Sequence, residues 1–193
     1  MADNEKKGAY GGAYWDDLRS SATAINPPGA AADPDVDTST GLLLFDAGST
    51  ELVFVAVQMP HGWIEGSTLV PHVHWMKTTA EAGDVSWRMR YRYANAGDVF
   101  SAWSSPVTVS SVVPGTPDND TAEKHLISTF GDLSIPTGRL SMMMIFEIAR
   151  IGGAAEDTYG ADATLLEFDV HYQRNQPGSS QQFVKYQDAR QYT

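Results

Sequence analysis

Two histidines separated by a single residue form the segment of this sequence best suited to bind a metal ion. They lie in Pro71-His72-Val73-His74-Trp75, whose Val and Trp residues favour a β-strand. Side chains two positions apart on a strand project from the same face, and their Cα atoms lie roughly 6.5 Å apart. Both imidazoles can therefore reach one ion.

A second run of metal-binding side-chain types lies near the end of the chain. Glu167, Asp169 and His171 alternate along a segment that reads as a strand, so they share one face. If this strand lies beside the first, His72, His74 and His171 with one carboxylate would suit Fe, Mn, Ni or Zn. The alternative is that the first two histidines hydrogen-bond to the carboxylates and hold no metal. No other cofactor is expected.

The strands that must position these residues follow one another with turn residues between nearly all of them. In the segment 139–150 the apolar residues alternate, a period of two that an amphipathic helix does not have. No long helical period occurs, and a short helix is expected only near 121–125. The pattern predicts an all-β fold, an antiparallel β-sandwich of the jelly-roll type spanning residues 41–174. The expected strands are 42–46, 51–58, 67–76, 84–93, 98–103, 106–113, 123–130, 139–150 and 163–173.

Length, charge and composition narrow the class of protein. A chain of 193 residues suffices for one domain with flanking arms, and the absence of cysteine excludes disulfides and thiolate metal sites. The net charge of −11 argues against nucleic acid and against anionic membrane surfaces as partners. The sequence shows no apolar leader and no stretch long enough for a membrane helix.

The flanking segments are polar but carry scattered aromatic residues. Residues 1–40, rich in Gly, Ala, Asp and Pro, are expected to form an extended N-terminal arm, and residues 175–193 a short C-terminal tail. Tyr14, Trp15 and Leu18 are candidate anchors on a neighbouring subunit, because aromatic side chains dominate many interfaces. The alternative is that the arm folds back onto its own domain.

Aromatic side chains also suggest a carbohydrate-binding role, because the flat faces of sugars stack on aromatic rings. Trp63, Trp103 and Tyr159 are candidates for such a platform on a host-surface glycan, although sandwich cores use the same residues. Arg88, Arg90 and Arg92 alternate along one expected strand, and we expect them to pair with acidic side chains on a neighbouring strand.

A short pattern resembles the first motif of the cupins. Gly66 is followed after five residues by His72-Val73-His74, although Thr78 and Thr79 stand where that motif has glutamate. Pro136-Thr137-Gly138 is similar to part of the second cupin motif. This resemblance implies the alternative of a metal-dependent enzyme that uses His72, His74 and His171.

A second resemblance covers three patches in the same order along the chain. These are residues 14–19, residues 57–75 and residues 166–173, which begin Tyr14-Trp15, Val57-Gln58 and Leu166. They are similar to a family of uncharacterised structural proteins of bacteriophages and prophages. The resemblance implies a non-enzymatic capsid or tail-appendage subunit, assembled in the host cytoplasm, located in the virion, and bound to copies of itself and to other virion proteins.

Overall fold

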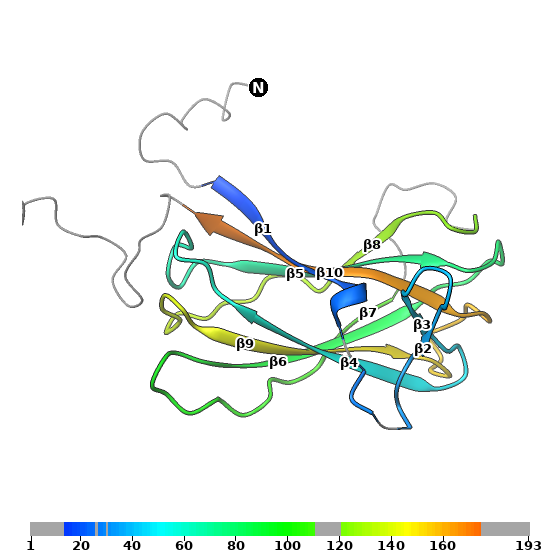
Figure 1. Ribbon diagram of the computed structural model, residues 1–193, viewed down its shortest axis with the longest axis horizontal. Helices are drawn as coiled ribbons and strands as arrows, with labels where there is room; N and C mark the ends of the chain where they lie inside the picture. The colour runs from blue at the N-terminus through cyan, green and yellow to red at the C-terminus, as the bar shows by residue number, and fades with distance from the viewer. Residues whose placement is uncertain (1–13, 26, 30, 111–120, 175–193) are drawn as a thin grey trace, which may run out of the picture.

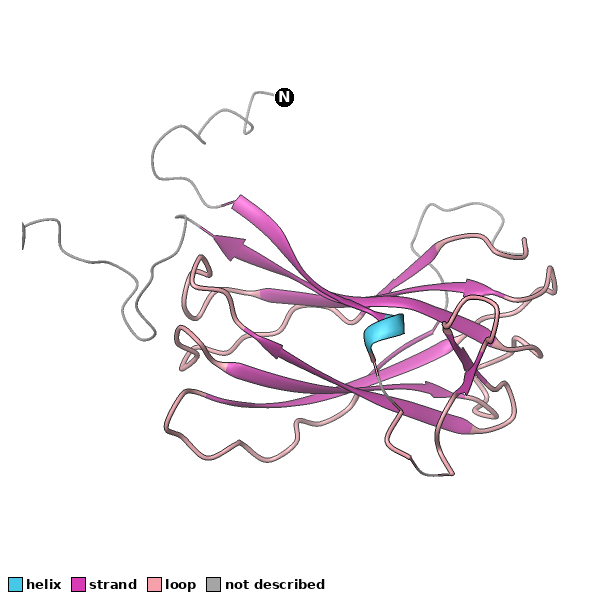
Figure 2. Cartoon of the chain, viewed as in Figure 1, coloured by secondary structure: helices cyan, strands magenta, loops and turns pink. Residues whose placement is uncertain are grey.

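The computed structural model describes residues 14–25, 27–29, 31–110 and 121–174, which form two antiparallel sheets packed face to face (Figure 1). The six-stranded sheet runs β2 (Asp35–Val36), β3 (Leu43–Phe45), β10 (Ala163–Arg174), β5 (Leu69–Lys77), β8 (Leu126–Thr129), with β1 (Tyr14–Ser21) also paired to β10. The four-stranded sheet runs β4 (Thr50–Gln58), β9 (Met143–Ile151), β6 (Ser86–Ala94), β7 (Val107–Ser110). Strands dominate the described residues, and Ala22–Ala24 form a short helical turn, η1, after β1 (Figure 2).

The order of strands β3 to β10 is that of a jelly roll. β3, β10, β5 and β8 lie in one sheet, and β4, β9, β6 and β7 lie in the other. Most successive strands therefore cross from one sheet to the other, as in two nested Greek keys. The prediction of an antiparallel jelly-roll sandwich is confirmed.

Alternating apolar side chains of the two sheets meet in one core. On β10 the residues Phe168, Val170 and Tyr172 face inward and are buried. The ring of Phe168 lies 4.8 Å from that of Phe146 on β9, centroid to centroid. Burial of a large apolar side chain stabilises the fold by about 1.5–3 kcal/mol, so these strands are held chiefly by their inner faces.

A buried arginine joins the two sheets at one end of the sandwich. Arg150, on β9, forms a bidentate ion pair with Asp157, with N–O distances of 2.9 and 2.7 Å. Neither side chain has any exposed area. The other donors of Arg150 bond the backbone carbonyls of Phe45, Ala161 and Tyr159. Because Phe45 belongs to β3 in the opposite sheet, this guanidinium links both layers with all its donors satisfied.

The observed strands differ from the sequence prediction at the N-terminal side. Residues 14–21, expected in an extended arm, form edge strand β1 of the six-stranded sheet, and residues 35–36 form β2. The segment 98–103 is not a strand, although Ser101 and Ser104 donate backbone hydrogen bonds to β6. The segment 121–125 forms turns instead of a helix. Within the described ranges, no helix has the length and apolar character needed to cross a membrane.

Candidate functional site

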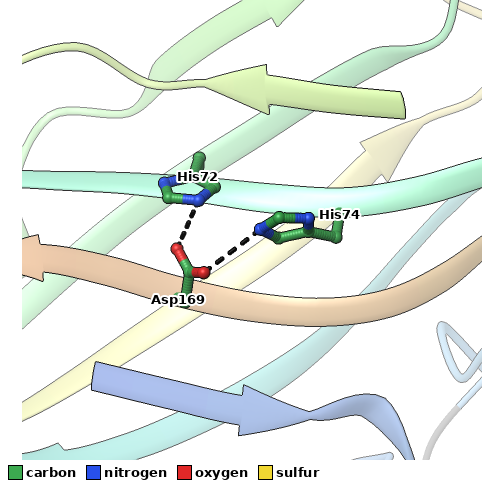
Figure 3. A group of neighbouring side chains, drawn as sticks. All are labelled: His72, His74 and Asp169. Atoms are coloured by element: carbon green, nitrogen blue, oxygen red, sulfur yellow. Dashed lines mark hydrogen bonds and ion pairs between the residues drawn. The ribbon is translucent and has the colours of Figure 1, made fainter. Parts of the chain in front are cut away.

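The paired histidines lie on the outer face of the six-stranded sheet, where β5 and β10 run side by side. The register sets Asp169 opposite His72 and Glu167 opposite His74. Because side chains alternate, the residues between them on both strands face the core, which leaves the polar row on the outside. In Figure 3 both imidazoles of β5 point toward the carboxylate of Asp169 on β10.

Asp169 binds the two histidines with its two oxygens. Nε2 of His72 lies 2.5 Å from Oδ1, and Nε2 of His74 lies 3.1 Å from Oδ2. The ligand-type atoms of these three side chains all lie within 4.8 Å of one another. His72 and Asp169 are buried, whereas the side chain of His74 keeps 19% of its surface exposed. Two nitrogens and a carboxylate thus converge on one small region.

The remaining ring nitrogens of both histidines face away from the carboxylate toward other partners. Nδ1 of His74 lies 2.6 Å from Nε2 of His125, which precedes β8. Nδ1 of His72 lies 3.4 Å from the backbone carbonyl oxygen of Val70. These contacts fix both rings with Nε2 directed at Asp169.

Strand β1 borders the cluster on the other side of β10. Oδ1 of Asp17 lies 3.1 Å from Nε2 of His171, and Arg19 forms a bidentate ion pair with Glu167. A cavity of about 350 Å³ opens beside the cluster. Its lining residues are Asp17, Arg19, His74, His125, Leu166, Glu167 and Asp169.

The pKa values of the two histidines shift in opposite directions. Burial lowers the pKa of His72, but the hydrogen bond and negative charge of Asp169 outweigh it, and the net pKa is raised. Burial, with the neighbouring charges of His72 and His125, lowers the pKa of His74. Burial raises the pKa of Asp169, yet its contacts with His72 and His74 bring it below the ordinary value.

The residues expected from the sequence, His72, His74 and His171 with one carboxylate, lie in two overlapping groups that share Asp169; His171 lies in the second, with Asp17. His171 shares the outer face and its ring lies 4.4 Å from that of His72, but it pairs with Asp17. The third member beside His72 and His74 is Asp169, which the sequence analysis named as a hydrogen-bond partner. The structure thus bears out the expected hydrogen bonding of the pair. His125 was missed, because its position depends on β8 pairing with β5.

The three aromatic residues named for a glycan platform do not come together. Trp63 and Tyr159 are in the core, with 0% and 1% exposure, and cannot present a ring to solvent. Trp103 is half-buried on the outer face of the four-stranded sheet, beside Phe54 at 6.0 Å between ring centroids. The alternative that sandwich cores use such residues holds for the first two.

The three expected subunit anchors differ in exposure. Tyr14 and Trp15 on β1 are 46% and 54% exposed, whereas Leu18 packs partly against the core. Along these residues the chain folds back onto its own domain, the alternative to an extended arm. The expected ion pairs of the arginine stripe are present for Arg88 and Arg90, which both reach Glu147 on β9.

Replacing Asp169 with Asn should reduce stability most at mildly acidic pH. His72 contributes stability below its ordinary pKa of 6.5 and loses it as pH rises through the higher folded value. Asp169 contributes above its ordinary pKa of 3.8 and loses it as pH falls through the lower folded value. The pair therefore stabilises most between pH 3.8 and pH 6.5.

We expect Asp169→Asn to lower the free energy of unfolding of chelator-treated protein by about 2 kcal/mol near pH 5.5, and by less near pH 8.5. Urea unfolding at both pH values measures this. Glu167→Gln is the matched control, because its partner Arg19 is exposed, and its loss of stability should be much smaller than that of Asp169→Asn at pH 5.5. An equal loss for Asp169→Asn at both pH values would contradict the assignment.

No protein-family model and no curated protein matches the chain. Among solved structures, an isomalto-dextranase of Arthrobacter globiformis complexed with panose is similar over 80% of this chain, at 19% identity and a TM-score of 0.43. This chain spans 23% of that enzyme's length. A family 35 carbohydrate-binding module from an environmental isolate is similar over 76% of this chain and 90% of its own, at 8% identity and a TM-score of 0.40.

A third similar structure is the module TmCBM61 in complex with β-1,4-galactotriose. It covers 84% of this chain and 88% of its own length, at 11% identity and a TM-score of 0.32. At such low identities and TM-scores, these similarities carry no argument about what this chain binds.

Proposed function

We propose that this protein is a non-enzymatic structural subunit of a virion that associates with copies of itself through strand β1. The observation that carries the proposal is an exposed aromatic pair on an edge strand. Tyr14 and Trp15 begin β1 and are 46% and 54% exposed, and as consecutive residues they project from opposite faces of the strand. Exposed apolar surface often marks a contact site, and aromatic side chains are enriched among the residues that dominate interfaces.

The edge position of β1 supports the same role. Within the described residues β1 pairs with β10 alone, so its other edge faces no strand. An open edge of eight residues offers backbone donors and acceptors to a strand of a neighbouring subunit.

The charged side chains of β1 are already engaged within the chain. Asp16 accepts from Arg174 and from Tyr172, at 2.7 and 3.2 Å. Arg19 is held by Glu167 on β10. These cross-strand contacts attach β1 to its own sheet and reduce the charge that would otherwise repel an incoming strand.

Replacing both aromatic residues should shift the protein from oligomer to monomer. We expect Tyr14→Ser with Trp15→Ser to raise the dissociation constant at least about 100-fold, because two exposed anchors are lost. Analytical ultracentrifugation of the full chain measures the change. Val99→Ser, at a site 93% exposed in a loop, is the control and should leave the oligomer intact.

The virion role is tested by mass spectrometry of particles released from cells that carry the gene. The wild-type chain and the Val99→Ser control should be incorporated, and the double variant should be depleted. A monomeric wild-type protein, or particles that lack the wild-type chain, would contradict the proposal.

A second candidate function, the binding of an acidic carbohydrate, rests on the outer face of the four-stranded sheet. There Arg88, Arg90 and Arg92 with Phe54 and Trp103 form what we call the arginine patch. Two of its guanidiniums, those of Arg88 and Arg90, pair with one buried carboxylate, Glu147, so the three arginines give the patch a local excess of positive charge on a chain of net charge −11.

The arrangement of the patch suits a ligand that carries both a ring face and a carboxylate. The guanidinium carbons of Arg90 and Arg92 lie 4.9 and 5.8 Å from the centroid of the Trp103 ring. The Nε atoms of all three arginines are buried and have no hydrogen-bond partner among the described residues. A planar guanidinium binds a carboxylate through two parallel hydrogen bonds, and a sugar can stack beside it on an aromatic ring.

This candidate predicts that oligogalacturonate binds and that a neutral oligogalactoside of equal length does not. Trp103→Ala should weaken oligogalacturonate binding roughly 10-fold, which corresponds to about 1.4 kcal/mol. Isothermal titration calorimetry measures the affinity, and Trp15→Ser is the matched tryptophan control. Equal affinity for both saccharides, or none for either, would count against it.

A further inference from the structure

From the geometry of the outer face we infer that His72, His74 and Asp169 form a binding site for one divalent transition-metal ion. This site goes beyond the proposed assembly role, because it uses a different part of the six-stranded sheet from the exposed aromatic pair. Both imidazoles come from β5 and the carboxylate comes from the neighbouring β10. Their ligand-type atoms lie within 4.8 Å of one another, a spacing that one ion can bridge after small adjustments.

The orientation of the two rings supports metal binding by Nε2. A histidine that binds a metal through one nitrogen usually donates the proton on its other nitrogen to a fixed acceptor. His74 directs Nδ1 at Nε2 of His125, at 2.6 Å, and His72 directs Nδ1 at the carbonyl oxygen of Val70, at 3.4 Å. With both protons on Nδ1, the two Nε2 lone pairs point at the same region as Asp169.

The donor set selects the class of ion. Two neutral imidazoles and a carboxylate suit Zn²⁺, Fe²⁺ or Ni²⁺ better than Mg²⁺ or Ca²⁺, which prefer oxygen ligands. Asp169 is already buried between the histidines. An ion there would replace the protons that now join the three side chains, and it would compensate the buried carboxylate with a positive charge.

The surroundings leave space for a further ligand from solvent. The cavity of about 350 Å³ beside the cluster is lined by both His74 and Asp169. Three protein ligands and an open fourth position are typical of zinc sites that bind water or a small molecule. At the wall of the cavity Arg19 neutralises Glu167, so that carboxylate is engaged away from the ion.

The contact between His125 and His74 allows a test of the site that removes no metal ligand. His125 is exposed and contacts His74, with its Nε2 2.6 Å from Nδ1 and its ring stacked on that ring at 4.9 Å between centroids. If it orients that ring, its removal should weaken metal binding without removing a ligand. An effect of roughly 10-fold to 100-fold is usual for such outer-shell partners.

The experiment is a titration of the full, chelator-washed chain with Zn²⁺, measured by isothermal titration calorimetry. The visible absorption of bound Co²⁺ gives a second measure of binding. We expect one ion per chain. His74→Gln, His72→Gln and Asp169→Asn should each weaken binding more than about 100-fold, and His125→Ala by about 10-fold to 100-fold. His61→Ala is the matched control, because His61 bonds Ser141 away from the cluster.

Circular dichroism of each variant shows whether it folds, and His74→Gln, the most exposed of the ligand replacements, keeps the test valid if the buried ones unfold. No saturable binding to the wild-type chain would overturn the inference. So would wild-type affinity in folded His74→Gln. A monomeric chain that still binds one Zn²⁺ would refute the proposed assembly role and leave the metal site standing.

Discussion

The alternation of side chains along β10 is the constraint on which both the core and the candidate site depend. This strand pairs with β1, β3 and β5, so it lies in the middle of the six-stranded sheet. Phe168 and Val170 face the core, and Asp169 between them must therefore face outward. A shift of register by one residue would bury the carboxylate in the core and expose the aromatic ring, so packing fixes the position of Asp169.

Two kinds of contact between the sheets hold the site in place. Phe146 and Phe168 pack across the sandwich, and Arg150 joins the two sheets at one end through a buried ion pair and three carbonyl contacts. A buried arginine with every donor satisfied tolerates little movement, because any displacement leaves a donor without a partner. The outer face of β5 and β10 is thus a rigid surface on which three polar side chains can be positioned accurately.

Much of the fold could be predicted from the sequence, because period-two patterns are local. The alternation of Met144, Phe146 and Ile148 identified β9, and the same rule placed His72 and His74 on one face. Strand β1 was missed, because Asp16, Asp17 and Arg19 conceal its strand character and its partners lie about 150 positions away, as the separation of 148 between Arg19 and Glu167 shows. That Asp169, and not Glu167, is the carboxylate between His72 and His74 depended on register, which no local pattern gives.

The burial of individual aromatic residues was also beyond a local pattern. Trp63 and Tyr159 lie in connections between strands, where exposure is usual, yet both fill the core. Trp103 lies in a similar connection and stays half-buried beside Arg90. The difference is set by which loop crosses the open end of the sandwich and which runs along its outer face, and only the tertiary structure decides that.

The central claim is that side chains of two neighbouring strands act as one binding site. X-ray absorption at the zinc edge of the loaded, full-length chain tests it most directly. The account predicts a first shell containing two imidazole nitrogens at about 2.0–2.1 Å together with oxygen ligands. A shell of oxygen atoms alone, or a spectrum unchanged in the His74→Gln variant, would show that any bound zinc lies elsewhere and would contradict the claim.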